Sequence, residues 1–169
     1  MSDTQHATNK PQNKLMLKRQ YRETRDKCIK EFINELTQLA GAAISKNKKD
    51  DDFRRRYDEY NIAKRDAPDE IVRLSGPPIW DYREDIMRGN IDKFLKADYR
   101  EDIKKYADRI PDVDYIEDER MLIEKIKRTW HLFQPAEQEV MLRRVQNLVS
   151  LYAQYVRINR LLGELNETK

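Results

Sequence analysis

Apolar residues recur at helical spacing through most of this chain, and that pattern constrains the fold more than any other feature. It is strongest over residues 135–162, where apolar side chains return every three or four positions and cover more than half of the helix circumference. A stripe this wide predicts a helix at the centre of its own bundle, or one shared with a partner chain. We therefore predict an all-α fold.

The scarcity of glycine supports this prediction. Only four of 169 residues are glycine, well below the usual share of about 7%. Tight hairpin turns and phosphate-cradling loops both consume glycine, so the composition disfavours β-sandwiches, β-barrels, Rossmann domains and P-loop domains. We expect an irregular helical bundle of five to seven helices.

The sequence divides into three predicted parts. Residues 1–13 are polar and are expected to form a disordered basic tail, and residues 14–67 a basic helical arm or hairpin that opens with a long helix of about 30 residues. Residues 68–169 are expected to form the helical core domain. The run Ser75-Gly76-Pro77-Pro78 is predicted to break the chain, and Gly89 is predicted to cap a helix C-terminus.

The positive charge is concentrated in the first part of the chain. Residues 1–65 carry 16 basic and 10 acidic side chains, whereas the whole chain has a formal net charge of +3. This excess favours an acidic partner such as nucleic acid, although an ordinary solvated helix surface also accounts for it. The candidate nucleic-acid contacts are Arg54, Arg55, Arg56, Lys18, Arg22 and Arg25. Because successive helical residues point about 100° apart, the three consecutive arginines cannot all face one groove.

The sequence offers little for catalysis or cofactor binding. Its single cysteine, Cys28, lies on an apolar helix face and is predicted to be a buried core residue, and His6 falls in the predicted tail, which leaves His131 as the usable histidine. This set cannot build a Cys/His zinc site within one chain. The run Asp50-Asp51-Asp52 fits a helix N-terminus better than a metal site. We predict no catalytic residue, metal or cofactor, no enzymatic activity and no small-molecule substrate.

A protein-interaction role is the leading hypothesis, with nucleic-acid binding as the alternative. The wide apolar stripe of residues 135–162, together with its continuation, predicts a contact with a protein partner or a second copy through Leu151, Tyr155, Ile158 and Leu165. No apolar run reaches the ~18 residues of a membrane span, and a single cysteine fits a reducing, intracellular compartment.

The central and C-terminal segments resemble a group of viral proteins. The residues that carry the resemblance are Ile79-Trp80, Ile86 to Asn90, Phe94 to Tyr99, Ile123 to Trp130 and the segment 135–155. This arrangement is similar to small helical proteins of nucleocytoplasmic large DNA viruses, of the chlorella-virus and mimivirus kind. The resemblance implies a structural protein of the virion or the host cytoplasm that works through protein contacts, and it transfers no functional residue.

Overall fold

The computed structural model describes residues 9–98 and 113–167, and it describes the side chains of residues 12–98 and 121–167. Every regular element in these ranges is a helix, which confirms the all-α prediction and the expected bundle of five to seven helices. The α-helices are α1 (Asn9–Lys46), α2 (Asp51–Asp66), α3 (Pro68–Asp81), α4 (Arg83–Met87), α5 (Asp92–Lys96), α7 (Val113–Thr129) and α8 (Pro135–Glu167). A 3₁₀ turn, Trp130–Leu132, joins α7 to the segment before α8.

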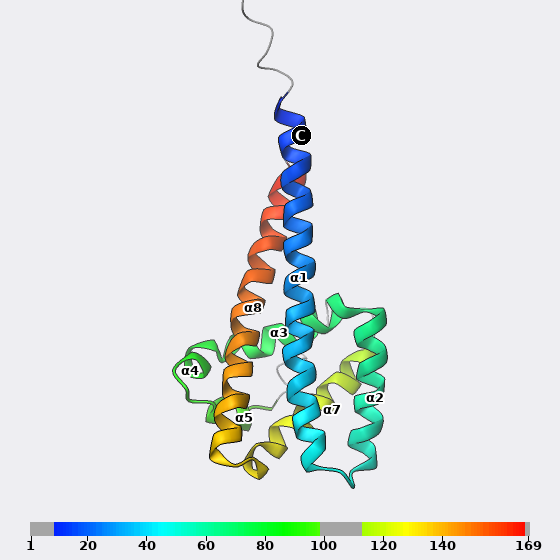
Figure 1. The fold of residues 1–169 in the computed structure, drawn as a ribbon, viewed down its shortest axis with the longest axis vertical. Coiled ribbons are helices and arrows are strands. Elements are labelled where there is room, and N and C mark those ends of the chain that lie inside the picture. Colours follow the sequence, from blue (N-terminus) through cyan, green and yellow to red (C-terminus); the bar gives the residue numbers. More distant parts are fainter. Residues whose placement is uncertain (1–8, 99–112, 168–169) are drawn as a thin grey trace, which may run out of the picture.

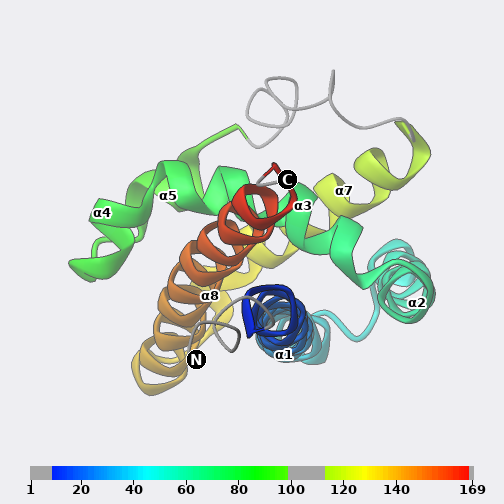
Figure 2. The same cartoon turned by 90° about the horizontal axis from the view of Figure 1, so that it is seen from above.

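Two long antiparallel helices, α1 and α8, form the axis of the molecule (Figure 1). Around one end of this pair, α2 and α7 lie on the α1 side, α4 and α5 lie on the α8 side, and α3 crosses both long helices (Figures 1 and 2). We call this part the base. The other end projects away from the base, and we call it the stalk; it consists of residues 12–28 of α1 and 154–167 of α8.

The base holds the main hydrophobic core. Its largest fully buried hydrophobic side chains come from six different helices, so each of those helices contributes to one shared cluster. They are Phe32, Phe53, Val72, Ile86, Leu122 and Leu148. Because Phe32 and Phe53 belong to the cluster, the core extends across the predicted division between residues 67 and 68 and includes the segment predicted as an arm.

The first helix is longer than the sequence pattern predicts. α1 begins at Asn9, inside the segment 1–13 that was expected to be a disordered tail. Pro11 is compatible with this start because the first turn of a helix has no intrahelical partner for its N–H groups. Residues 1–8 lie outside the described ranges.

The predicted break at Ser75-Gly76-Pro77-Pro78 is wrong. α3 continues through both prolines to Asp81. Proline in a helix interior removes a hydrogen bond and normally ends the helix, but packing holds this last turn in place. Pro78 and Ile79 are buried, and the Trp80 ring packs edge-on against Tyr152 of α8 with 6.1 Å between ring centroids. A Cβ at Gly76 would overlap the same Tyr152 ring, so this glycine allows α3 to approach α8 closely.

Two short-range signals act as the sequence predicts. Asp50 caps α2, with its Oδ1 accepting a hydrogen bond from the Phe53 N–H at 2.8 Å. Gly89 follows α4 with a φ of +84°, a backbone conformation that favours glycine, and its N–H donates to the Ile86 carbonyl. These two residues fix where α2 begins and where α4 ends.

Candidate functional site

The stalk is held together by a small cluster of its own. Cys28 packs with Ile158 and Leu162, and the partly buried Tyr21 lies against them. The Cys28 thiol also donates to Gln154 Oε1 at 3.4 Å, and burial raises its pKa above the ordinary value of a thiol. The predicted burial of Cys28 is confirmed, and its raised pKa makes it a poor nucleophile at neutral pH.

Beyond this cluster, the stalk exposes large apolar side chains. Leu15 and Met16 are 70% and 61% exposed near the start of α1, and this end of α1 belongs to the projecting stalk (Figure 1). Val156 on α8 is 48% exposed. Single exposed apolar residues are ordinary on protein surfaces, but here they lie on the stalk, which projects from the base (Figure 1).

The four interface residues predicted on α8 have different environments. Leu151 is half-buried against the main core, and Leu165 is partly buried in the stalk. Tyr155 and Ile158 are buried within the chain itself, and the Tyr155 hydroxyl donates to Asp69 Oδ1 at 2.6 Å. Their burial shows that much of the wide apolar stripe of α8 is used inside the molecule. Sequence reasoning missed Leu15 and Met16 because they lie outside the main apolar stripe of α1.

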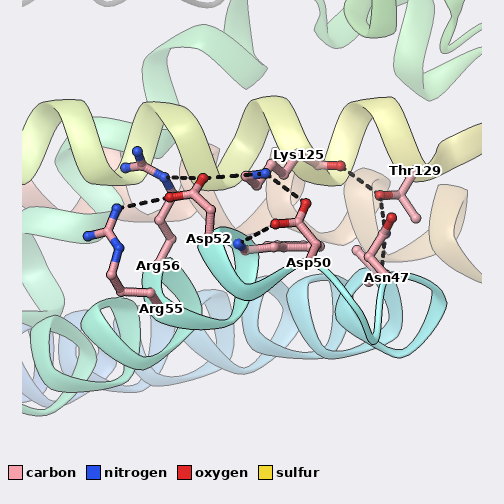
Figure 3. A network of polar contacts seen from close by, with 9 residues as sticks. Asn47, Asp50, Asp52, Arg55, Arg56, Lys125 and Thr129 are labelled. Carbon is pink, nitrogen blue, oxygen red and sulfur yellow. Dashed lines mark hydrogen bonds and ion pairs between the residues drawn. The ribbon is translucent and has the colours of Figure 1, made fainter.

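The three consecutive arginines of α2 are engaged by neighbouring groups. Arg55 donates to Asp52 Oδ1 at 3.0 Å, and Arg56 donates to Asp52 Oδ2 at 3.1 Å (Figure 3). Arg55 also donates to Glu59 Oε1 at 2.6 Å. Arg54 donates to the carbonyl of Lys48. The bonds from Arg55 and Arg56 hold the pKa of Asp52 at about 2. These intramolecular pairs reduce the charge available to a nucleic acid.

A polar network connects the start of α2 to α7. Lys125 Nζ lies 2.8 Å from Asp50 Oδ2 and 3.4 Å from Asp52 Oδ2 (Figure 3). One turn further along α7, Asn47 Nδ2 donates to Thr129 Oγ1 at 2.9 Å, and Thr129 in turn donates to the Lys125 carbonyl. The hydrogen bond from Lys125 is the main reason that the pKa of Asp50 is lowered.

We call this network the clasp, because it joins the segment before α2 and the start of α2 to α7. The adjacent cavity measures about 250 Å³, and the exposed His131 is among the residues that line it. The carboxylates of Asp50 and Asp52 are held in their charged form by basic partners, which is the opposite of what a general acid requires. Within the described side chains, no group of three or more His, Cys, Asp or Glu residues is placed to hold a metal ion.

The remaining predicted cations lie together on α1. Lys18, Arg22 and Arg25 follow one another at intervals of four and three residues, which places them on one side of the helix. Arg22 is exposed, whereas Lys18 and Arg25 are partly buried. Arg25 lies where the stalk meets the base, and it lines a second and larger cavity of about 500 Å³ between α1, the end of α2 and the start of α3.

No family model, curated protein or solved structure matches the chain. The resemblance to proteins of large DNA viruses, with the virion or host-cell location that it implies, therefore stays a prediction. Among the helices of the described ranges, none combines the length and apolar character that a membrane span requires.

Proposed function

We propose that this chain is a non-enzymatic protein-interaction protein whose stalk associates with the stalk of a second copy. The observation that carries the proposal is the exposure of Leu15 and Met16 on a projecting pair of helices. Adjacent helical residues point about 100° apart, so these two side chains leave apolar surface on two sides of the α1 tip. Contact with another protein would remove that surface from water.

A second copy suits the stalk as a partner because two helices alone bury little. The stalk cluster contains only Cys28, Ile158 and Leu162 as buried residues. Two antiparallel pairs placed side by side make a four-helix bundle, the usual arrangement in which such pairs bury their apolar faces. A two-fold contact also requires no second type of surface, since the same patch meets itself.

Charge indicates how the two stalks would be oriented. Residues 12–28 of α1 contain six basic and two acidic side chains, whereas residues 154–167 of α8 contain two of each. Packing α1 against α1 of the second copy would bring two basic surfaces together, which is unfavourable. The expected dimer therefore places α1 of one copy against α8 of the other.

The proposal is tested by light scattering on a sizing column over a range of protein concentrations. The unsubstituted chain is expected to form a dimer, and the double variant Leu15→Glu, Met16→Glu is expected to be a monomer with unchanged helical content. The matched control is Ile62→Glu, Met87→Glu, since both of these residues are 51% exposed in the base. A chain that is monomeric at every concentration, or two double variants that behave alike, would contradict the proposal.

The choice of variants follows from the structure. Ile158→Glu would place a charge inside the stalk cluster, and loss of association would then report only that the stalk had opened. Substitutions at Leu15 and Met16 avoid this problem because most of both side chains is already in water.

Nucleic-acid binding remains the second candidate, and the arrangement of α1 favours one set of the predicted residues over the other. Lys18 and Arg22 have no ion-pair partner among the described residues, whereas Arg55 and Arg56 are paired with Asp52. If the chain binds a short DNA duplex, the affinity should fall steeply as the salt concentration rises. The double variant Lys18→Gln, Arg22→Gln should lose more affinity for the duplex than the double variant Arg55→Gln, Arg56→Gln. Equal losses, or binding that does not respond to salt, would exclude this candidate.

A further inference from the structure

The larger cavity lies at the junction of the stalk and the base. Its volume of about 500 Å³ falls within the range of small-molecule sites, roughly 300–1,000 Å³. Apolar lining comes from Ile29 and Ile33 of α1 and from Pro68 at the start of α3. Basic lining comes from Arg25, Lys30 and Lys64. The cavity thus combines an apolar surface with an excess of positive charge.

Two carboxylates also line the cavity, and each has a partner within the chain. Asp69 Oδ1 accepts the hydrogen bond from the Tyr155 hydroxyl at 2.6 Å. Asp26 Oδ1 lies 3.6 Å from Arg25 Nη2, an ion pair at the surface. Neither Lys30 nor Lys64 has a carboxylate partner among the described residues, although the Lys64 ammonium lies 6.0 Å from the centroid of the Tyr60 ring.

Arg25 presents a donor that the described part of the chain does not satisfy. Its Nε atom is buried and has no hydrogen-bond partner there. Buried polar atoms in folded proteins almost always have such a partner, because leaving a donor without an acceptor in a dry place is unfavourable. An oxyanion in the cavity that Arg25 lines would offer this guanidinium an acceptor in addition to Asp26.

We propose that this cavity binds a small organic oxyanion, with its carboxylate or phosphate group beside Arg25, Lys30 and Lys64 and its apolar portion against Ile29, Ile33 and Pro68. A nucleic-acid strand suits the cavity less well. None of the lining residues is aromatic, so the site has no ring on which a base could stack. In addition, the carboxylates of Asp26 and Asp69 in the lining would repel the neighbouring phosphates of a long polyanion.

Four probes separate the parts of this proposal in calorimetric titrations of the full chain. Phenyl phosphate and benzoate carry both an oxyanion and an apolar ring, phenol carries the ring alone, and inorganic phosphate carries the anion alone. At least one of the first two is expected to bind about tenfold more tightly than phenol, since a charge-assisted hydrogen bond is worth roughly that factor. It is also expected to bind more tightly than inorganic phosphate, which lacks an apolar ring to contact the apolar lining. Tighter binding of phenyl phosphate would indicate a phosphate ligand, and tighter binding of benzoate a carboxylate ligand. Failure of both to bind would overturn the proposal.

A charge-matched pair of variants locates the binding. Lys30→Gln, Lys64→Gln is expected to weaken binding of the favoured probe by about tenfold or more, whereas Lys48→Gln, Lys49→Gln removes the same charge from the exposed connection after α1 and should leave it unchanged. Thermal melts of both variants check that each is folded. Equal affinities in the two variants would overturn the site.

Two further measurements distinguish a small-anion site from a polyanion surface and from the stalk contact. A short single-stranded oligonucleotide that bound more tightly than the favoured probe, and lost affinity in the cavity variant, would overturn the proposal in favour of a polyanion. The favoured probe should also bind normally to Leu15→Glu, Met16→Glu, because those residues do not line the cavity. Failure of the dimer and failure of the anion site are therefore separate results.

Discussion

The stalk and the base are built from the same two helices, yet those helices are buried to different degrees in the two regions. Phe32 of α1 and Leu148 of α8 are each 1% exposed in the base, where they belong to one cluster with side chains of α2, α3, α4, α5 and α7. In the stalk, α1 and α8 pack mainly against each other, and the cluster between them consists of three buried residues with one ring against them. Since a helix gains most of its stability from packing, the base should be the more stable region.

Leucine truncation should show the largest difference between the regions. Leu148 and Leu162 lie on the same helix, four turns apart, and both are buried. Leu148→Ala should lower the free energy of unfolding by an amount near the top of the ~2–5 kcal/mol range for such substitutions, because the packed base cannot collapse around the cavity. Leu162→Ala should fall at or below the bottom of that range. Urea denaturation followed by circular dichroism measures both values.

A result in which the two truncations destabilise the chain equally would contradict the comparison. It would mean that the stalk is as tightly packed as the base, as it would be inside a stable dimer. Repeating the measurement in the Leu15→Glu, Met16→Glu background would then separate packing within the chain from packing between copies.

Two of the helical glycines, Gly76 and Gly163, provide a second comparison, with effects of opposite sign. An added Cβ at Gly76 would overlap the Tyr152 ring, whereas at Gly163 in the stalk it would meet no atom within 4 Å. Gly76→Ala should therefore destabilise the chain by about 1–3 kcal/mol through overpacking. Gly163→Ala should stabilise it by up to about 1 kcal/mol, the difference in helix propensity. Thermal melts report both shifts, and a neutral Gly76→Ala would show that α3 and α8 can separate without loss.

Cys28 provides a direct measure of stalk opening. Its thiol is buried and its pKa is raised by that burial, so a thiol-specific reagent should modify it more slowly than a free cysteine at the same pH. If reaction occurs through local opening of the stalk, Leu162→Ala should accelerate it by about tenfold or more, and Leu148→Ala should accelerate it less. The opposite order would show that Cys28 becomes accessible only when the base unfolds.

The sequence predicts the elements of this fold better than their contacts. The three- and four-residue spacing that includes Cys28, Phe32 and Leu36 is enough to identify α1 and its buried side. The continuation of α3 through Pro77 and Pro78 could not be predicted in the same way. It depends on Tyr152, a residue more than 70 positions away that packs against Gly76.

The candidate sites show the same limit. The pairing of Arg55 with Asp52 and Glu59 follows from helical spacing, and the acidic neighbours of the arginines are visible in the sequence. A third partner of Asp52, Lys125, is distant in the sequence and carries no local signal. The cavity beside Arg25 is likewise formed by three helices whose approach is a property of the packed base.

The smallest expected effect concerns the response of the clasp to acid. Asp50 and Asp52 have lowered pKa values, Asp52 to about 2, so their charged forms stabilise the folded chain above their ordinary pKa of about 4. That stability is lost as the pH falls from about 4 towards about 2. Asp52→Asn should make the acid decline of the unfolding free energy shallower, and Asp51→Asn, which removes a neighbouring exposed carboxylate, should not. Because Asp52 is largely in water, the difference is expected to be small.

Denaturation curves at a series of acidic pH values measure this difference, and hydrogen exchange should place the change in α2 and α7 of the base. Superimposable curves for the two variants would show that the ion pairs of Asp52 do not contribute to the stability of the base.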